Sequence, residues 1–211
     1  MKVFNKRNVL DALKVIGVML VIVMLCFFIG TASLSGEGVF NWILFAAFLL
    51  VYFLSGFIDG SVRGEGECRQ SERLENQTKR TGIPLDEDEI ARKFSPKKGA
   101  SVAFMAAIPG IVLFLLAVIT ADGNDILRAA TRIYFTPYLK LFSAGAQLWQ
   151  VLLIYFAGAV VYPALYFAGY MSGPRQHSKI KQIIKQNDED YKKGIRRRRP
   201  KPKKRRRSFF G

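Results

Sequence analysis

Four long apolar segments alternate with charged segments along the chain. The uncharged runs cover residues 15–36, 38–58, 99–121 and 141–174, and each is at least 21 residues long. About 20 apolar residues in an α-helix cross the ~30 Å hydrocarbon core of a bilayer. A helix of this length in a soluble protein would carry a polar stripe, whereas these runs are apolar all round. The pattern therefore predicts an all-α, polytopic membrane protein with four transmembrane helices in a bundle.

The charged segments divide the chain into parts with different roles. In chain order, these parts are a transmembrane hairpin at 1–58 with spans at about 15–34 and 39–58, a cytoplasmic loop with short helices at 59–98, a second pair of spans at 99–174 with the spans themselves at about 99–121 and 141–171, and a basic cytoplasmic tail at 175–211. The connector TASLSGEG between the first two spans is short, so these spans should pack as an antiparallel hairpin.

Two helix starts can be read within the charged segment between the second and third spans. Asp86 is placed to cap a short helix in PLDEDEIARKF, with Glu89 three residues later in capping-box position. Ser95 and Pro96 then start another helix, because Ser is a favoured N-cap and Pro a favoured first helical residue. This helix becomes the third span, which Pro109 is expected to bend.

An amphipathic segment precedes the fourth span. In GNDILRAATRIYF the apolar residues recur at helical spacing with arginines opposite, which predicts a short helix in the outer membrane interface. Thr136 and Pro137 then start the last helix. Three tyrosines of this span, Tyr162, Tyr166 and Tyr170, suit the membrane interfaces. The small residues of the span form only a loose small-xxx-small pattern, without a clean GxxxG run inside the bilayer.

Lys and Arg are distributed very unevenly among the segments. The N-terminus, the segment 59–98 and the tail carry 29 of the 32, and the segment between the third and fourth spans carries 3. Basic residues in short loops mark the cytoplasmic side. We therefore expect a multi-pass integral protein of the cytoplasmic membrane with both termini in the cytoplasm. Cleavage of residues 1–32 as a signal peptide is an open alternative, because a basic start and an apolar run precede GTAS.

The sequence offers little for catalysis or metal binding. No span carries an ionisable residue near its middle, and His177 is the only histidine. Cys26 lies in a span and Cys68 in a charged segment, and neither has a CxxC partner. Nucleophile-elbow, phosphate-loop and zinc-protease motifs are not found. We expect a non-enzymatic protein without a cofactor, a metal ion or catalytic residues.

The segment 196–207 reads RRRRPKPKKRRR, and ten of its twelve residues are Lys or Arg. Its prolines and the repulsion between like charges predict that it is disordered. The residues expected to bind anionic lipid or nucleic acid are Arg196, Arg197, Arg198, Arg199, Lys201, Lys203, Lys204, Arg205, Arg206 and Arg207. Before them, HSKIKQIIKQNDEDYKKG places three isoleucines on one helical face, and this helix is expected to lie flat on the inner leaflet.

The expected partners follow from this tail. The lipid bilayer holds the spans, and anionic lipid headgroups at its surface concentrate negative charge near the basic residues. Nucleic acid or the ribosome also offers dense phosphate, and an unidentified acidic protein is a third partner. A tail that only fixes the topology and binds nothing specific remains open. We interpret the chain as a membrane accessory or scaffold protein; the alternatives are a membrane subunit of a transport or secretion complex and a tether for ribosomes or nucleic acid.

Overall fold

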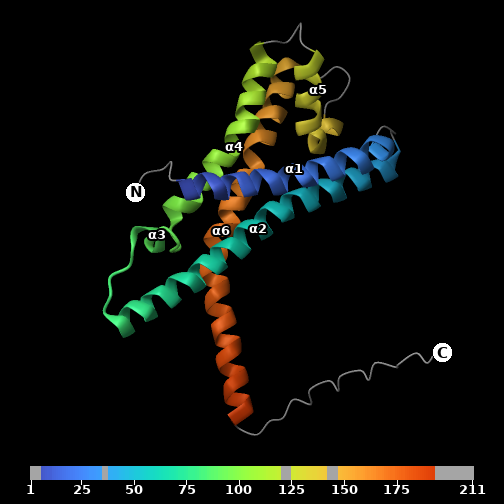
Figure 1. The fold of residues 1–211 in the computed structure, drawn as a ribbon. Coiled ribbons are helices and arrows are strands. Elements are labelled where there is room, and N and C mark those ends of the chain that lie inside the picture. Colours follow the sequence, from blue (N-terminus) through green and yellow to red (C-terminus); the bar gives the residue numbers. More distant parts are fainter. Residues whose placement is uncertain (1–5, 35–37, 120–124, 142–146, 193–211) are drawn as a thin grey trace, which may run out of the picture.

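The computed structural model describes residues 6–34, 38–119, 125–141 and 147–192, and every regular element in these ranges is helical (Figure 1). The elements are α1 (Lys6–Leu34), α2 (Val39–Thr81), α3 (Glu87–Ile90), α4 (Pro96–Ile119), α5 (Asp125–Tyr134), the 3-10 helix η1 (Thr136–Leu141) and α6 (Leu148–Lys192). The described part of the chain therefore has the all-α class that the sequence predicts.

Four of these helices, α1, α2, α4 and α6, are long and apolar enough to cross a membrane. They overlap the four uncharged runs of the sequence. Large apolar side chains remain exposed along them, among them Leu25, Ile43, Leu115 and Leu153. Such a surface is unfavourable in water and suits the hydrocarbon of a bilayer. The prediction of four helices of membrane-spanning length and composition is confirmed.

The helix of the second span continues far beyond its apolar part. The sequence analysis expects a loop with short helices from residue 59, but α2 runs without a break to Thr81. The helix ends at Gly82, whose φ of 69° is accessible to glycine without strain. The Gly82 N–H donates to the Thr78 carbonyl oxygen at 2.8 Å, which satisfies one of the last carbonyl groups of the helix.

Ion pairs spaced four residues apart support the polar half of α2. Arg63 Nε lies 3.1 Å from Asp59 Oδ1. Arg69 Nη2 lies 2.7 Å from Glu65 Oε1. Pairs at this spacing lie on one helix face and each stabilise a helix by about 0.2–0.5 kcal/mol. They do not offset several glycines in the same stretch, so the helix also needs the packing against α6 that is described below.

The last helix begins later and ends later than the sequence predicts. Thr136 and Pro137 start η1, not the last span, and α6 begins at Leu148. From there α6 is continuous to Lys192. The isoleucine-bearing segment after the apolar run is therefore the C-terminal half of α6, and not a separate helix on the surface of a leaflet.

The shorter elements lie close to where the sequence places them. In α3, the Asp86 N–H donates to Glu89 Oε2 at 3.2 Å, which is the return half of a capping box. α4 begins at Pro96 and passes through Pro109 without a break; the bend at this residue stays a prediction. α5 occupies the amphipathic segment, and it packs its last residue, Tyr134, into the protein.

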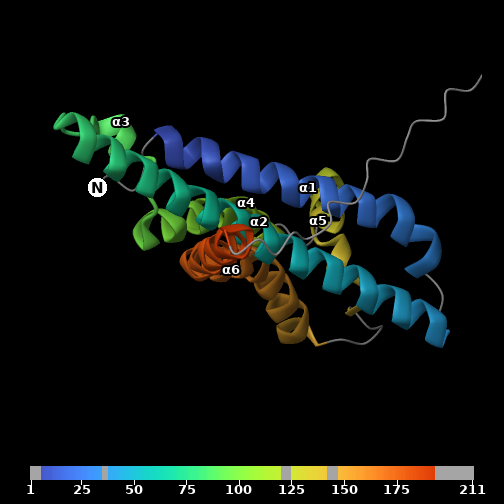
Figure 2. The same ribbon diagram turned by 90° about the horizontal axis from the view of Figure 1, so that it is seen from below.

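The four long helices form two pairs that cross each other. α1 lies beside α2, and α4 lies beside the first half of α6 (Figures 1 and 2). α2 crosses α6 near the middle of both helices, and this is the most extensive helix contact in the described part of the protein. Beyond the crossing, the polar halves of α2 and α6 diverge, so the end of each helix projects separately (Figure 1).

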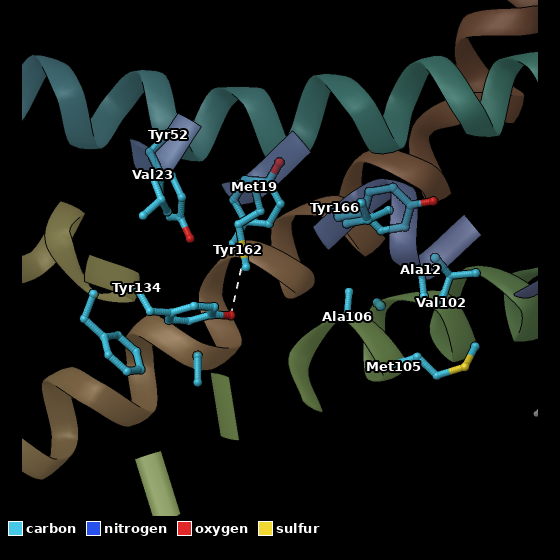
Figure 3. Packing of buried hydrophobic residues seen from close by; sticks show 14 of the residues in the cluster. Ala12, Met19, Val23, Tyr52, Val102, Met105, Ala106, Tyr134, Tyr162 and Tyr166 are labelled. Carbon is cyan, nitrogen blue, oxygen red and sulfur yellow. Dashed lines mark hydrogen bonds between the residues drawn. The ribbon is translucent and has the colours of Figure 1, made fainter. Parts of the chain in front are cut away.

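Buried side chains from all four long helices and from the α5–η1 segment pack together around the crossing (Figure 3). Tyr52 of α2 and Tyr162 of α6 lie against each other, with ring centroids 4.9 Å apart. Tyr134 of α5 points toward α1, where its hydroxyl donates to Met19 Sδ at 3.7 Å (Figure 3). The outer α5–η1 segment is thus attached to the core through aromatic side chains.

The tyrosines of α6 do not occupy the membrane interfaces that the sequence analysis assigns to them. Tyr162, Tyr166 and Tyr170 are 0%, 2% and 1% exposed. They are spaced four residues apart and therefore lie on the one face of α6 that meets α2. The amphipathic character of Tyr suits an interface, but its ring area also fills a helix contact, and here the second use prevails.

Candidate functional site

α2 and α6 approach so closely that glycine is required at their contact. A Cβ at Gly60 would lie 2.0 Å from the Tyr166 carbonyl oxygen, and a Cβ at Gly64 would lie 2.3 Å from that of Tyr170. On α6, a Cβ at Gly169 would lie 2.0 Å from the α2 backbone. Small residues four positions apart permit this kind of backbone contact. The crossing lies where the apolar run of α2 gives way to charged residues, which is where the sequence analysis expects a loop.

A pocket of about 320 Å³ lies beside this crossing. All four long helices contribute to its lining. The side chains that give it chemical character are Asp11 of α1, Arg63 and Glu67 of α2, Lys98 of α4 and Tyr170 of α6. Two acidic and two basic groups thus meet in one place, although they are far apart in the sequence.

Lys98 is the most deeply buried charge of the pocket. Its Nζ donates to Glu67 Oε1 and, at 3.2 Å, to the carbonyl oxygen of Ala91. Asp11 Oδ2 lies 3.8 Å from the same Nζ. Lys98 is in the first turn of α4, where the helix dipole disfavours a cation. The two carboxylates therefore have to compensate both the loss of hydration and the dipole.

Tyr170 connects Glu67 to the start of α4. The Tyr170 hydroxyl donates to Glu67 Oε2 at 2.5 Å and accepts the Ser95 N–H at 3.3 Å. The ring of Phe94 stacks on the ring of Tyr170, with centroids 4.9 Å apart. Glu67 thus receives a hydrogen bond at each carboxylate oxygen, one from Lys98 and one from Tyr170, and is held in a defined orientation.

Asp11 is surrounded by cations but is not held by direct hydrogen bonds. Arg63 Nη1 lies 3.8 Å from Asp11 Oδ1, and Lys14 Nζ lies 3.5 Å from the same oxygen. Among the described residues, none donates a hydrogen bond of normal length to this carboxylate. Arg63 directs its Nε to Asp59. A guanidinium has five N–H donors, so Arg63 and Asp11 both keep hydrogen-bonding capacity toward the pocket.

A second charged cluster joins the polar halves of α2 and α6 beyond the pocket. Glu72 of α2 lies 2.9 Å from His177 Nε2 of α6, and Lys181 Nζ of α6 contacts its other oxygen. Hydrogen bonds from Lys181 and then from His177 hold the pKa of the Glu72 carboxyl below its usual value. The cluster is partly exposed, so its contribution to stability is small. It fixes the relative rotation of the two helices where they begin to diverge.

Cys68 lies in the polar half of α2, outside the apolar span. Burial, followed by the negative charges of Glu67 and Glu65, raises the pKa of its thiol to about 11. The thiol is therefore protonated at neutral pH and a weak nucleophile. Within the described ranges, no group of three or more His, Cys, Asp or Glu side chains is arranged to hold a metal ion.

The site residues expected from the sequence and the pocket found in the structure are different. The ten basic residues of 196–207 lie outside the described residues, which end at Lys192. The pocket was missed because residues 59–98 were interpreted as a loop. One signal was available: Gly56, Gly60 and Gly64 recur every four residues, which is the spacing of a helix contact face.

Comparison with known proteins does not identify a family. No protein-family model matches the sequence, and no curated protein or solved structure is significantly similar to it.

Proposed function

We propose that this chain is a non-enzymatic accessory or scaffold protein of the cytoplasmic membrane, and that its segment 196–207 binds anionic lipid headgroups. In this proposal α1, α2, α4 and α6 form one bundle across the bilayer, with both termini in the cytoplasm. The charge distribution supports this orientation, because 29 of the 32 Lys and Arg residues are on the proposed inner side.

The observation that carries the proposal is the continuity of α6. This helix extends from the apolar span to Lys192, only a few residues before the basic segment. Its polar half, residues 172–192, is about 31 Å long at 1.5 Å per residue. The twelve residues of 196–207 reach about 40 Å when extended, so they can return to the membrane surface from the end of the helix. Each Lys or Arg near an anionic surface then contributes about 1 kcal/mol.

The same observation supports a second candidate. The polar half of α6 diverges from α2, and its Ile183 and Ile184 are exposed (Figure 1). A projecting helix with a polybasic end also suits a subunit of a transport or secretion complex, or a tether for ribosomes or nucleic acid, in which the tail meets a partner away from the membrane.

Binding of a peptide of residues 195–211 to vesicles tests the first candidate. We expect binding to anionic vesicles at low salt, release as salt is raised, and the same affinity for a scrambled peptide, because the interaction depends on charge and not on residue order. Much weaker binding of the scrambled peptide, or binding that ignores salt, contradicts the lipid proposal. Crosslinking of the full-length protein in cells then distinguishes lipid from RNA or a protein partner.

A further inference from the structure

We propose that the pocket beside the α2–α6 crossing binds the headgroup of one phospholipid that carries a primary amine and a phosphate, of the phosphatidylethanolamine class. This site is separate from the basic tail, and it selects a lipid by hydrogen bonding as well as by charge.

The charges of the pocket match a zwitterion. Asp11 is a carboxylate with cations 3.5–3.8 Å away and with no direct hydrogen bond from a described residue. It is therefore a suitable acceptor for the N–H groups of an ammonium. Arg63, on the same pocket, holds Asp59 through Nε and has further N–H donors for a phosphate. A ligand with only one sign of charge would leave one of these two groups without a matching partner.

The remaining pair of charges is already satisfied and forms the floor of the site. Lys98 and Glu67 bind each other, and Tyr170 holds the second oxygen of Glu67. This pair keeps α2, α4 and α6 together around the pocket, so the orientation of the site does not depend on the ligand. The volume of about 320 Å³ is within the usual range of small-molecule sites.

The position of the pocket indicates a lipid and not a soluble zwitterion. Leu10 and Leu13, which flank Asp11 on α1, are 49% and 57% exposed. Val62, the neighbour of Arg63 on α2, is 62% exposed. Exposed aliphatic side chains at the level of the charged groups place the pocket where hydrocarbon meets the headgroup layer. Val102 and Tyr166 give the pocket an apolar part that suits the glycerol end of a lipid.

The test uses the full-length protein in detergent, with native mass spectrometry to count bound lipids and to measure affinity. The probes are phosphatidylethanolamine, phosphatidylcholine and water-soluble glycerophosphoethanolamine. The wild type should bind one phosphatidylethanolamine about tenfold more tightly than phosphatidylcholine, because a trimethylated ammonium cannot donate a hydrogen bond to Asp11. The soluble headgroup should bind more weakly than the lipid.

The variants assign this preference to the pocket. Asp11→Asn should reduce the preference to within about twofold. Glu75→Gln, which removes an exposed acid of α2 outside the pocket lining, should leave it unchanged. Removal of residues 195–211 should also leave it unchanged, which separates this site from the tail.

Two results overturn the proposal. One is equal binding of the two lipids by the wild type, which requires no variant. The other is an unchanged preference in Asp11→Asn. Equally tight binding of glycerophosphoethanolamine would replace the lipid with a soluble ligand.

Discussion

Lys98 is only 2% exposed and yet carries a full charge at the start of a helix that enters the membrane. Such a burial is tolerated only when the charge is paired and its donors are satisfied. Glu67 and the Ala91 carbonyl oxygen accept hydrogen bonds from it, and Asp11 adds a longer ion pair. The pair is poor in net stabilisation but specific, because only one packing of α1, α2 and α4 brings these groups together.

Glycine at the helix crossing determines whether α2 and α6 can meet at all. We predict that Gly60→Ala lowers the free energy of unfolding by about 2 kcal/mol or more, since the added Cβ would lie 2.0 Å from the Tyr166 carbonyl oxygen. Gly66→Ala is the control on the same helix, because a Cβ there meets no atom within 4 Å. This second change should be neutral or should stabilise the helix by up to ~1 kcal/mol.

Thermal unfolding of both variants in detergent measures this difference. A Gly60→Ala protein that is as stable as Gly66→Ala would show that the two helices do not touch at this residue.

At the scale of elements, the apolar spans were predictable and the ends of two helices were not. A run of about 20 apolar residues has one structural solution in a bilayer, so α1 and α4 follow from composition alone. The polar half of α2 has no such constraint. Its glycines and charges read as a loop locally, and it is helical because Gly60 and Gly64 pack against a distant helix.

The pocket could not be predicted for the same reason. Asp11, Glu67, Lys98 and Tyr170 are spread over four helices, and only the crossing of α2 with α6 brings them together. The burial of the three α6 tyrosines depends on that contact as well. Their spacing of four residues predicts that they share a face, but the sequence alone does not say whether the face meets lipid or protein.

A disulfide across the crossing tests the packing of these two elements. Ser61 Oγ of α2 lies 3.3 Å from Ser172 Oγ of α6. We predict that cysteines at both positions, in a Cys26→Ser/Cys68→Ser background, form a disulfide on mild oxidation, because their sulfur atoms start close together. Gel mobility after protease cleavage between the helices measures the product.

Cysteines at Ser61 and Ser178 provide the matched control, since Ser178 is exposed and directs its hydroxyl to the backbone of α6. Equal yields from the two pairs would indicate a mobile α2 and would contradict the packed crossing.

At the scale of the whole molecule, the polar features gather at the same ends of the long helices. The first residues of α1, the polar half of α2, the start of α4 and the polar half of α6 hold the pocket and the Glu72 cluster (Figure 1). The opposite ends carry the α5–η1 segment and few charges. This polarity is what a bilayer requires of a protein with one strongly basic side, and it yields a prediction of orientation.

We predict that the polar half of α2 faces the cytoplasm and that the α1–α2 connector faces outward. In the Cys26→Ser/Cys68→Ser background, a cysteine at Asn76, which is exposed on α2, should react with a membrane-impermeant maleimide only after the cells are permeabilised. A cysteine at Ser35 in the connector should react in intact cells. The energetic reason is the cost of moving the basic side across the membrane, because 29 of the 32 Lys and Arg residues are on it. Labelling at Asn76 in intact cells, with protection at Ser35, would reverse the orientation and place the pocket and the basic tail on the outer face.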